Sequence, residues 1–113
     1  MDTSPIIIAG GGIAGLAAAL ALGPHEALIL EQTPAFTTAG AGLQIGPNAV
    51  RALQKLGAWD AVQPYTTKPK EIQFRDGVSG KIISRLPLGP AFAARYGADY
   101  HVAHRAGLHA GLL

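Results

Sequence analysis

The chain has 113 residues, close to the usual size of one domain, so we expect at most one hydrophobic core. Apolar residues make up 49% of the sequence and charged residues only 14%, which excludes an intrinsically disordered chain. The formal net charge of +2 is too small to indicate a nucleic-acid-binding surface. The sequence contains no cysteine, which excludes disulfide bonds and thiolate metal sites and favours a cytoplasmic location.

The first 31 residues have the pattern of a βαβ unit. Residues 5–9 (PIIIA) form a short apolar run that is typical of a strand buried on both faces. Residues 13–22 are rich in alanine and leucine and are followed by a Gly-Pro pair, which predicts a helix and its end. Residues 27–30 (ALIL) predict a second buried strand, with Glu31 at its end. We therefore expect two parallel strands joined by a crossover helix.

The segment from Ile6 to Leu22 is apolar and therefore resembles a signal peptide or a membrane span. Four glycines interrupt it, and it is shorter than the roughly 20 residues that cross a bilayer. We predict neither, and we expect no membrane partner.

The middle of the chain predicts a loop followed by a helix. Residues 33–48 are rich in glycine, threonine and proline, which predicts an extended loop. Apolar residues then recur at three-residue steps after a proline, which predicts a helix over 48–56 that ends at Gly57. A further turn of helix is expected over 58–62.

The last third of the chain mixes strands and helices. Residues 72–74 and 81–86 flank an Asp-Gly pair, which predicts two strands around a turn. We expect residues 87–99 to form an irregular connection, residues 100–103 a short strand, and a helix to begin at Arg105. The element order predicts an α/β fold. Because the chain ends inside the last helix without a capping residue, we expect it to be the N-terminal part of a longer protein.

A glycine motif lies between the first strand and the first helix. Gly10, Gly12 and Gly15 match G-x-G-x-x-G, in which the glycines allow a tight turn, the approach of a pyrophosphate, and close packing of helix and strand. The helix N-terminus offers unpaired N–H groups to phosphates. Glu31 follows at the spacing of a carboxylate that binds ribose hydroxyls, and it would repel a 2′-phosphate, so NADP is not expected in this site. The alternative is a tight turn followed by a surface glutamate.

Four longer motifs are more specific for a protein family than the glycine motif. They are GGGIAGLAAALAL…ALILEQ, AGAGLQIGPNAVRALQKLGAWD, RLPLG and HRAGLHAGLL. In these motifs the chain resembles the N-terminal part of the FAD-dependent aromatic-ring monooxygenases, and the resemblance extends over nearly the whole chain. These are single-component flavin hydroxylases, salicylate-hydroxylase-like and with the para-hydroxybenzoate hydroxylase fold. The resemblance implies that residues 1–113 are the N-terminal part of a Rossmann-like FAD-binding domain of glutathione-reductase type. It also implies tightly but non-covalently bound FAD, NAD(P)H as co-substrate, and hydroxylation of a small aromatic molecule.

The resemblance implies specific cofactor contacts. The pyrophosphate would be held by four residues of the glycine turn: Gly10, Gly12, Ala14 and Gly15. Glu31 and Gln32 would face the adenosine ribose. The segment 40–44 would run beside the flavin with Gln44 as its side-chain contact, and Arg105 would reach the FAD phosphates or ribityl chain. The alternatives are a surface ion pair for Arg105 and a solvent-facing amide for Gln44.

The chain departs from the family pattern in two places and lacks one part. Gly107 stands where the family usually has Asp, which weakens the start of the last helix. The segment between Leu22 and Ala27 is about two residues shorter than is common, which trims the first helix. The family's second flavin motif would follow residue 113, so no residue here is predicted to be catalytic, and residues 1–113 alone are expected to be inactive.

Other functions remain open from the sequence. The intact protein could be an FAD-dependent oxidase or dehydrogenase with the same N-terminal half, or the chain could be a non-catalytic fragment. His101, His104 and His109 have a spacing that fits no common metal site, so no metal is predicted. The sequence leaves open the substrate, its regiochemistry, the choice between NADH and NADPH, and the oligomeric state.

Overall fold

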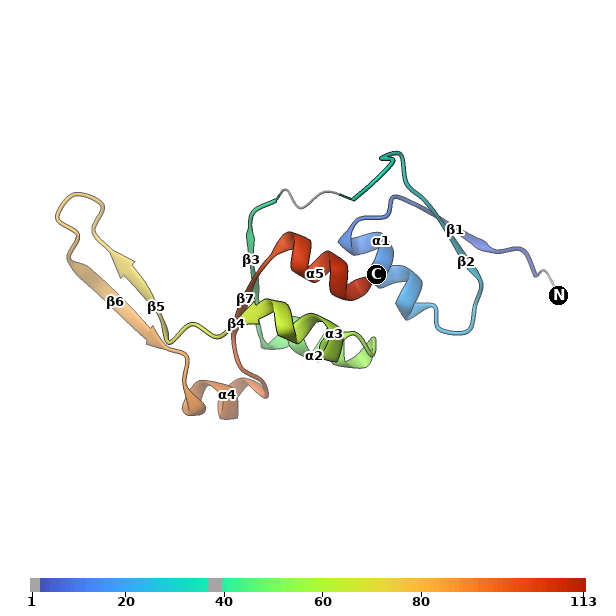
Figure 1. Ribbon diagram of the computed structural model, residues 1–113. Coiled ribbons are helices and arrows are strands. Elements are labelled where there is room, and N and C mark those ends of the chain that lie inside the picture. Colours follow the sequence, from blue (N-terminus) through green and yellow to red (C-terminus); the bar gives the residue numbers. More distant parts are fainter. Residues whose placement is uncertain (1–2, 37–39) are drawn as a thin grey trace.

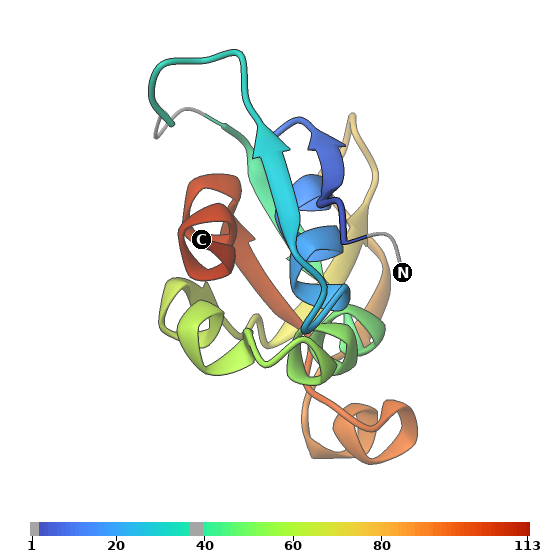
Figure 2. The ribbon, with the colours of Figure 1, turned by 90° about the vertical axis from the view of Figure 1, so that its right-hand side faces the viewer.

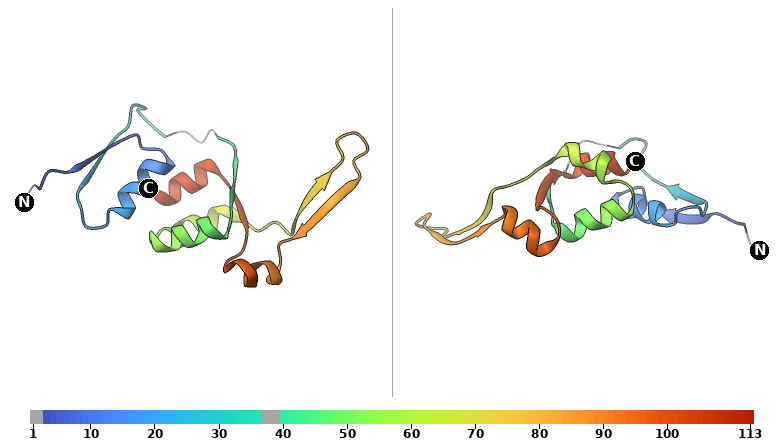
Figure 3. Two further views of the ribbon diagram at one scale, coloured as in Figure 1. Left: turned by 180° about the vertical axis from the view of Figure 1, so that it is seen from behind. Right: turned by 90° about the horizontal axis from the view of Figure 1, so that it is seen from below.

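The computed structural model describes residues 3–36 and 40–113. The molecule is elongated, with principal dimensions of 61 × 32 × 21 Å. Its centre is a group of helices packed against a small antiparallel sheet, and a two-stranded hairpin extends from one end (Figures 1 and 3). At the opposite end lies the N-terminal βαβ unit, so the mixed α/β character that the sequence predicts is confirmed.

The βαβ unit has the predicted arrangement. Strands β1 (Ile6–Ala9) and β2 (Ala27–Leu30) are parallel, and helix α1 (Ile13–Ala21) connects them. Figure 2 shows the two strands side by side in front of α1. The prediction that β1 is buried on both faces and that β2 is buried is wrong, because Ile7 is 63% and Leu30 53% exposed. Within the described part of the chain, α1 packs on one face of this two-stranded sheet and the other face has no cover.

A second sheet lies at the centre of the molecule. Its strand order is β3 (Gly42–Ile45), β7 (His101–His104) and β4 (Thr66–Thr67), and all pairs are antiparallel. The predicted loop over 33–48 is therefore wrong for residues 42–45, and its positions 37–39 lie outside the described residues. Strand β3 forms because it pairs with β7, and Ile45 at its end is only 2% exposed. The glycine-rich sequence of this segment does not reveal a pairing partner so far away in the chain.

The core forms where the helices meet this sheet. Helices α2 (Pro47–Lys55), α3 (Trp59–Val62) and α5 (Arg105–Leu112) confirm the three predicted helical segments, and a 3-10 turn, η1 (Gln63–Tyr65), follows α3. The buried apolar residues come from these helices, α1 and the sheet: Leu16, Ile45, Val50, Leu53, Ala58, Val62, Ala103, Leu108 and Leu112.

Glycines let α5 lie very close to its neighbours in this core. A Cβ on Gly111 would lie 2.6 Å from Val62 Cγ2, and a Cβ on Gly107 would lie 2.7 Å from Tyr65 Cβ. Gly107 therefore contributes to this packing, and α5 begins after His104 without a side-chain cap.

The hairpin consists of the predicted strand pair, β5 (Glu71–Arg75) and β6 (Ile82–Pro87). Asp76 closes its turn by accepting hydrogen bonds from the N–H groups of Val78 and Ser79. The prediction of an irregular connection over 87–99 is wrong, because residues 90–96 form helix α4 (Pro90–Tyr96). Both end signals were in the sequence: a proline at the first helical position, and Gly97 after the last with φ of +83°. None of the helices in the described residues has the length and apolar character needed to cross a bilayer.

Candidate functional site

Gly10, Gly12 and Gly15, in the motif between β1 and α1, differ in why each position suits glycine. Gly10 has φ of +114°, a conformation that residues with a side chain rarely adopt. A Cβ on Gly15 would overlap the carbonyl oxygen of Gly10, so α1 can pack against the turn only without one. Gly12 has φ of −76°, and the nearest protein atom to a Cβ there, Arg105 Nη2, would be 3.7 Å away. The protein itself therefore does not require glycine at position 12, which is what a backbone that a ligand must approach would show.

Glu31 connects the end of β2 to the glycine turn. Its Oε2 accepts a hydrogen bond from the N–H of Gly11 at 2.8 Å, and its Oε1 accepts one from the N–H of Thr33 at 3.2 Å. These donors, Gly11 first, lower the pKa of the Glu31 carboxyl below its ordinary value. The group is therefore a carboxylate at neutral pH, and it lies beside the positive end of α1.

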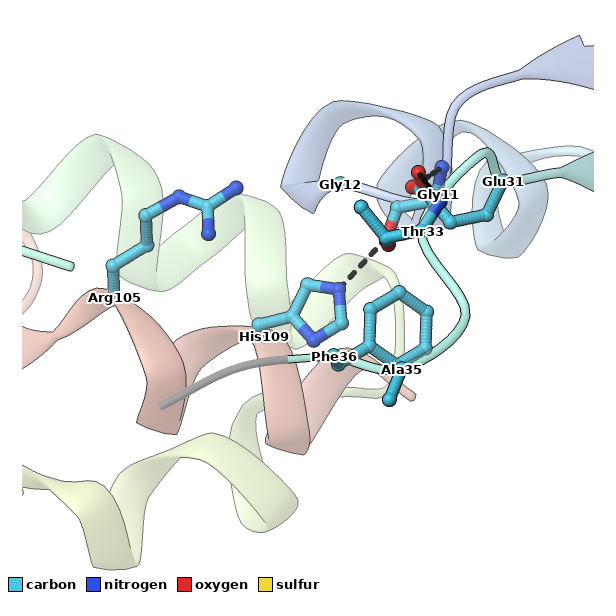
Figure 4. A pocket seen from close by; sticks show the side chains of 8 residues that line it. All are labelled: Gly11, Gly12, Glu31, Thr33, Ala35, Phe36, Arg105 and His109. Atoms are coloured by element: carbon cyan, nitrogen blue, oxygen red, sulfur yellow. Dashed lines mark hydrogen bonds between the residues drawn. The ribbon is translucent and has the colours of Figure 1, made fainter. Parts of the chain in front are cut away.

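Helix α5 brings two side chains to the same place (Figure 4). Arg105, its first residue, is exposed, and its guanidinium extends towards Gly12. No carboxylate in the described residues forms an ion pair with it; the ion pairs found there are Lys68–Asp99 and Arg85–Glu71. His109, one turn later, is buried, and its Nε2 lies 2.7 Å from the carbonyl oxygen of Gly11.

These groups line a cleft of about 200 Å³. Its lining residues are Gly11, Gly12, Glu31, Thr33, Ala35, Phe36, Arg105 and His109. Since pockets for whole ligands usually measure roughly 300–1,000 Å³, the cleft suits part of a ligand. A guanidinium and a helix N-terminus favour an anion such as a phosphate, whereas a carboxylate accepts hydrogen bonds from hydroxyl groups.

The structure brings some of the predicted site residues together and separates others. Gly12, Glu31 and Arg105 line the cleft, and Gly10, Glu31 and Gln32 line a neighbouring hollow. Ala14 is exposed in the first turn of α1, beside Gly15. Gln44 is different, because it lies exposed on β3 opposite Val102 and lines neither space.

Sequence reasoning missed several lining residues, of which Phe36 and His109 are the largest. The ring of Phe36 lies against the imidazole of His109, with 4.4 Å between ring centroids. The spacing of His109, four residues after Arg105, was a usable signal, because residues at i and i+4 share one face of a helix. His101 lies elsewhere: its Nδ1 is 3.0 Å from Thr66 Oγ1, its ring packs edge-on against Trp59, and burial lowers its pKa.

Comparison with known proteins gives consistent matches over almost the whole chain. It is 41% identical over 111 residues to the 3-hydroxybenzoate 6-hydroxylase of Polaromonas naphthalenivorans (strain CJ2), and the matched region covers 96% of this chain and 28% of the relative. It is 42% identical over 110 residues to a 3-amino-4-hydroxybenzoate 2-monooxygenase of Streptomyces platensis, with the same two coverages. No protein-family model matches the chain.

Solved structures agree with the sequence matches. The crystal structure of Klebsiella pneumoniae HpxO complexed with FAD and uric acid superimposes with a TM-score of 0.81 and 28% identity, over 96% of this chain and 28% of HpxO. The predicted resemblance to aromatic-ring monooxygenases is thus confirmed, and the fold matches their N-terminal regions. The chain spans about 28% of the length of these relatives.

Proposed function

We propose that this chain binds the adenosine and pyrophosphate part of FAD within an NAD(P)H-dependent monooxygenase that hydroxylates a small aromatic molecule. The observation that carries the proposal is the convergence of Gly12, Glu31 and Arg105 on one cleft, from three separate segments of the chain. Two further findings support the proposal. The relatives are named as a hydroxylase and a monooxygenase, and the structure of HpxO contains FAD.

The residues present suit the two ends of an adenosine diphosphate group. Gly10, Gly12, Ala14 and Gly15 would present the backbone at the start of α1 to the pyrophosphate, and Arg105 would add a planar fork of donors. Glu31 would accept hydrogen bonds from the ribose hydroxyls, with Gln32 beside it. When bound, FAD supplies the redox and oxygen chemistry, and the protein supplies binding, orientation and exclusion of water.

The finer features of the prediction belong to the same proposal. We assign residues 1–113 to the N-terminal part of a glutathione-reductase-type FAD-binding domain and place segment 40–44, with Gln44, beside the flavin ring. The exposed residues of β1 and β2 support this assignment, because a parallel sheet in a complete domain has both faces covered by other packed elements. We propose a cytoplasmic location, consistent with the absence of cysteine, and no activity for residues 1–113 alone.

The test is expression of the intact protein followed by a flavin spectrum and an assay of NADH and NADPH oxidation. We expect a yellow protein whose NAD(P)H oxidation is stimulated by hydroxybenzoates, with hydroxylated product. Arg105→Ala should weaken FAD binding about tenfold or more, the scale of a charge-assisted hydrogen bond. Arg85→Ala, at an exposed arginine of the hairpin, is the matched control and should leave FAD binding unchanged.

The outcomes separate the alternatives. A folded protein that neither retains nor binds FAD would overturn the proposal. Stoichiometric FAD with aromatic-stimulated oxygen consumption but no hydroxylated product would indicate an oxidase instead.

A further inference from the structure

A buried hydrogen bond joins α5 to the glycine turn. His109 is 7% exposed, and its Nε2 lies 2.7 Å from the carbonyl oxygen of Gly11, 98 residues away in the sequence. A carbonyl oxygen only accepts hydrogen bonds, so Nε2 carries the proton and donates it. Neither a ribose nor a phosphate is needed to explain this bond, because both partners belong to the protein.

We infer that His109 is a positioning residue for the cofactor: it holds the glycine turn against α5, so that Gly12 and Arg105 face the same phosphates. This inference rests on the proposed binding of FAD. Arg105 and His109 are four residues apart on α5 and therefore project from the same face of the helix. His109 fixes that face to Gly11, and Arg105 reaches Gly12, the next residue of the turn.

The bond also fixes the orientation of a peptide group. The N–H of Gly11 donates to Glu31 Oε2 at 2.8 Å, and its carbonyl accepts from His109, so both polar groups of this buried residue are held. The peptide between Gly11 and Gly12 is trans, so the N–H of Gly12 points away from the carbonyl of Gly11. That N–H has no acceptor within the described part of the chain. By holding the carbonyl, His109 sets the direction in which this free donor points.

The surroundings strengthen the bond. Phe36 lies over the imidazole with 4.4 Å between the ring centroids, and its Cε1 would be 3.4 Å from a Cβ on Gly11. The aromatic ring therefore covers both partners and limits the access of water, which makes the hydrogen bond stronger and its loss more costly. Figure 4 shows the ring beside the imidazole, on the side away from Arg105.

The experiment compares two amides that differ by one methylene, in the intact protein. His109→Gln places its amide nitrogen near the position of Nε2 and can restore the bond to Gly11. His109→Asn is equally polar but too short, and it leaves the buried carbonyl without a donor. We expect the Asn variant to bind FAD about tenfold more weakly than wild type and the Gln variant to stay within about threefold. ADP, which has the pyrophosphate but no flavin, should show the same order of affinities.

A second buried histidine gives the matched control. His101 is 5% exposed and bonds to Thr66 on the sheet, and it does not line the cleft. His101→Asn should lower the melting temperature, because it removes the ring that packs against Trp59, but it should leave FAD affinity unchanged.

Each result decides the inference. Equal FAD affinity of the Gln and Asn variants, an equal loss in His101→Asn, or a loss seen with FAD but not with ADP would overturn it while the proposed function stands. If wild-type protein binds no FAD, the proposed function fails and the inference fails with it. If His109→Asn does not fold, the Gln variant decides, since an affinity more than about tenfold below wild type in a folded Gln variant contradicts rescue.

Discussion

Two carboxylates in this molecule have the same local chemistry in different regions. Glu31 accepts hydrogen bonds from the N–H groups of Gly11 and Thr33, and Asp76 accepts them from Val78 and Ser79. In both cases these donors lower the pKa of the carboxyl group. The hydrogen bonds alone therefore do not show which of the two acids belongs to a binding site.

The difference lies in which segments each acid connects. The partners of Asp76 follow it within three residues, and they close the turn of a hairpin that projects into solvent, where Val78 is fully exposed. Glu31 instead reaches a residue 20 positions earlier, in a cleft that it shares with Arg105 and His109. A local capping carboxylate stabilises one turn, whereas a carboxylate that joins distant segments helps to assemble a site.

The largest effect is expected from a side chain on the glycine turn. Gly12→Val should give a folded but colourless protein, with FAD binding weakened more than about a hundredfold, because the branched side chain occupies the approach of the pyrophosphate. Gly77→Val in the hairpin turn is the control, since a Cβ there meets no protein atom within 4 Å and a Cβ at Gly12 meets only Arg105 Nη2, at 3.7 Å. Flavin absorbance of the purified proteins checks both, and a full flavin content in Gly12→Val would show that the turn does not bind the cofactor.

Removing each carboxylate tests the comparison directly. Glu31→Ala in the intact protein should weaken FAD binding about ten- to a hundredfold, the scale of hydrogen bonds to a charged group. Asp76→Ala should leave the FAD dissociation constant unchanged and affect only the hairpin. Fluorescence titration with FAD measures both variants, and equal dissociation constants would mean that Glu31, like Asp76, is only a structural cap.

The βαβ unit was predictable because its signals are local. The apolar runs, Gly10 to Gly15 and Glu31 lie within 31 residues, and each signal follows from backbone geometry within a few positions. The helix over 90–96 was equally local, with Pro90 and Gly97 at its ends, and the prediction missed it by giving too much weight to the glycines and prolines around it.

The other half of the site was not predictable from residue patterns. The bond between His109 and Gly11 spans 98 residues, and strand β3 forms through its pairing with β7. Arg105 was predicted only through the resemblance to the aromatic-ring monooxygenases, because the sequence around a single arginine at the start of a helix does not show which ligand or segment the side chain contacts. Gln44 came from the same resemblance, and its exposed place on β3, outside the cleft, leaves its contact with the flavin a prediction.

A moderate effect on stability is expected where α5 meets α3. In Gly111→Ala the new Cβ would lie 2.6 Å from Val62 Cγ2 and 2.9 Å from Val62 Cα. Alanine favours a helix over glycine by roughly 1 kcal/mol, but overpacking against a backbone atom costs about 1–3 kcal/mol. The free energy of unfolding should therefore fall, whereas Gly77→Ala in the hairpin should leave it nearly unchanged. Urea denaturation measures both, and a stabilised Gly111→Ala would contradict the close contact.

The smallest effect is a pH dependence that both carboxylates share. Their pKa values are lowered in the folded protein, so each acid contributes stability that is fully present above the pKa of the unfolded chain, about 4.3 for Glu and 3.9 for Asp. That contribution is lost as the pH falls through the lower pKa of the folded state. Wild type should therefore exceed Glu31→Gln and Asp76→Asn in stability at pH 7, and both differences should shrink as the solution is acidified below about pH 4.

FAD affinity separates the two acids in the same experiment. Lowering the pH should weaken FAD binding by wild type and by Asp76→Asn, whereas Glu31→Gln should lose less, because it has no carboxylate left to protonate at this position. Stability is measured by urea denaturation and affinity by fluorescence titration, at matched ionic strength from pH 7 to pH 3.5. A stability difference that stays constant on acidification would show that the N–H groups of Gly11 and Val78 do not favour the ionised acids.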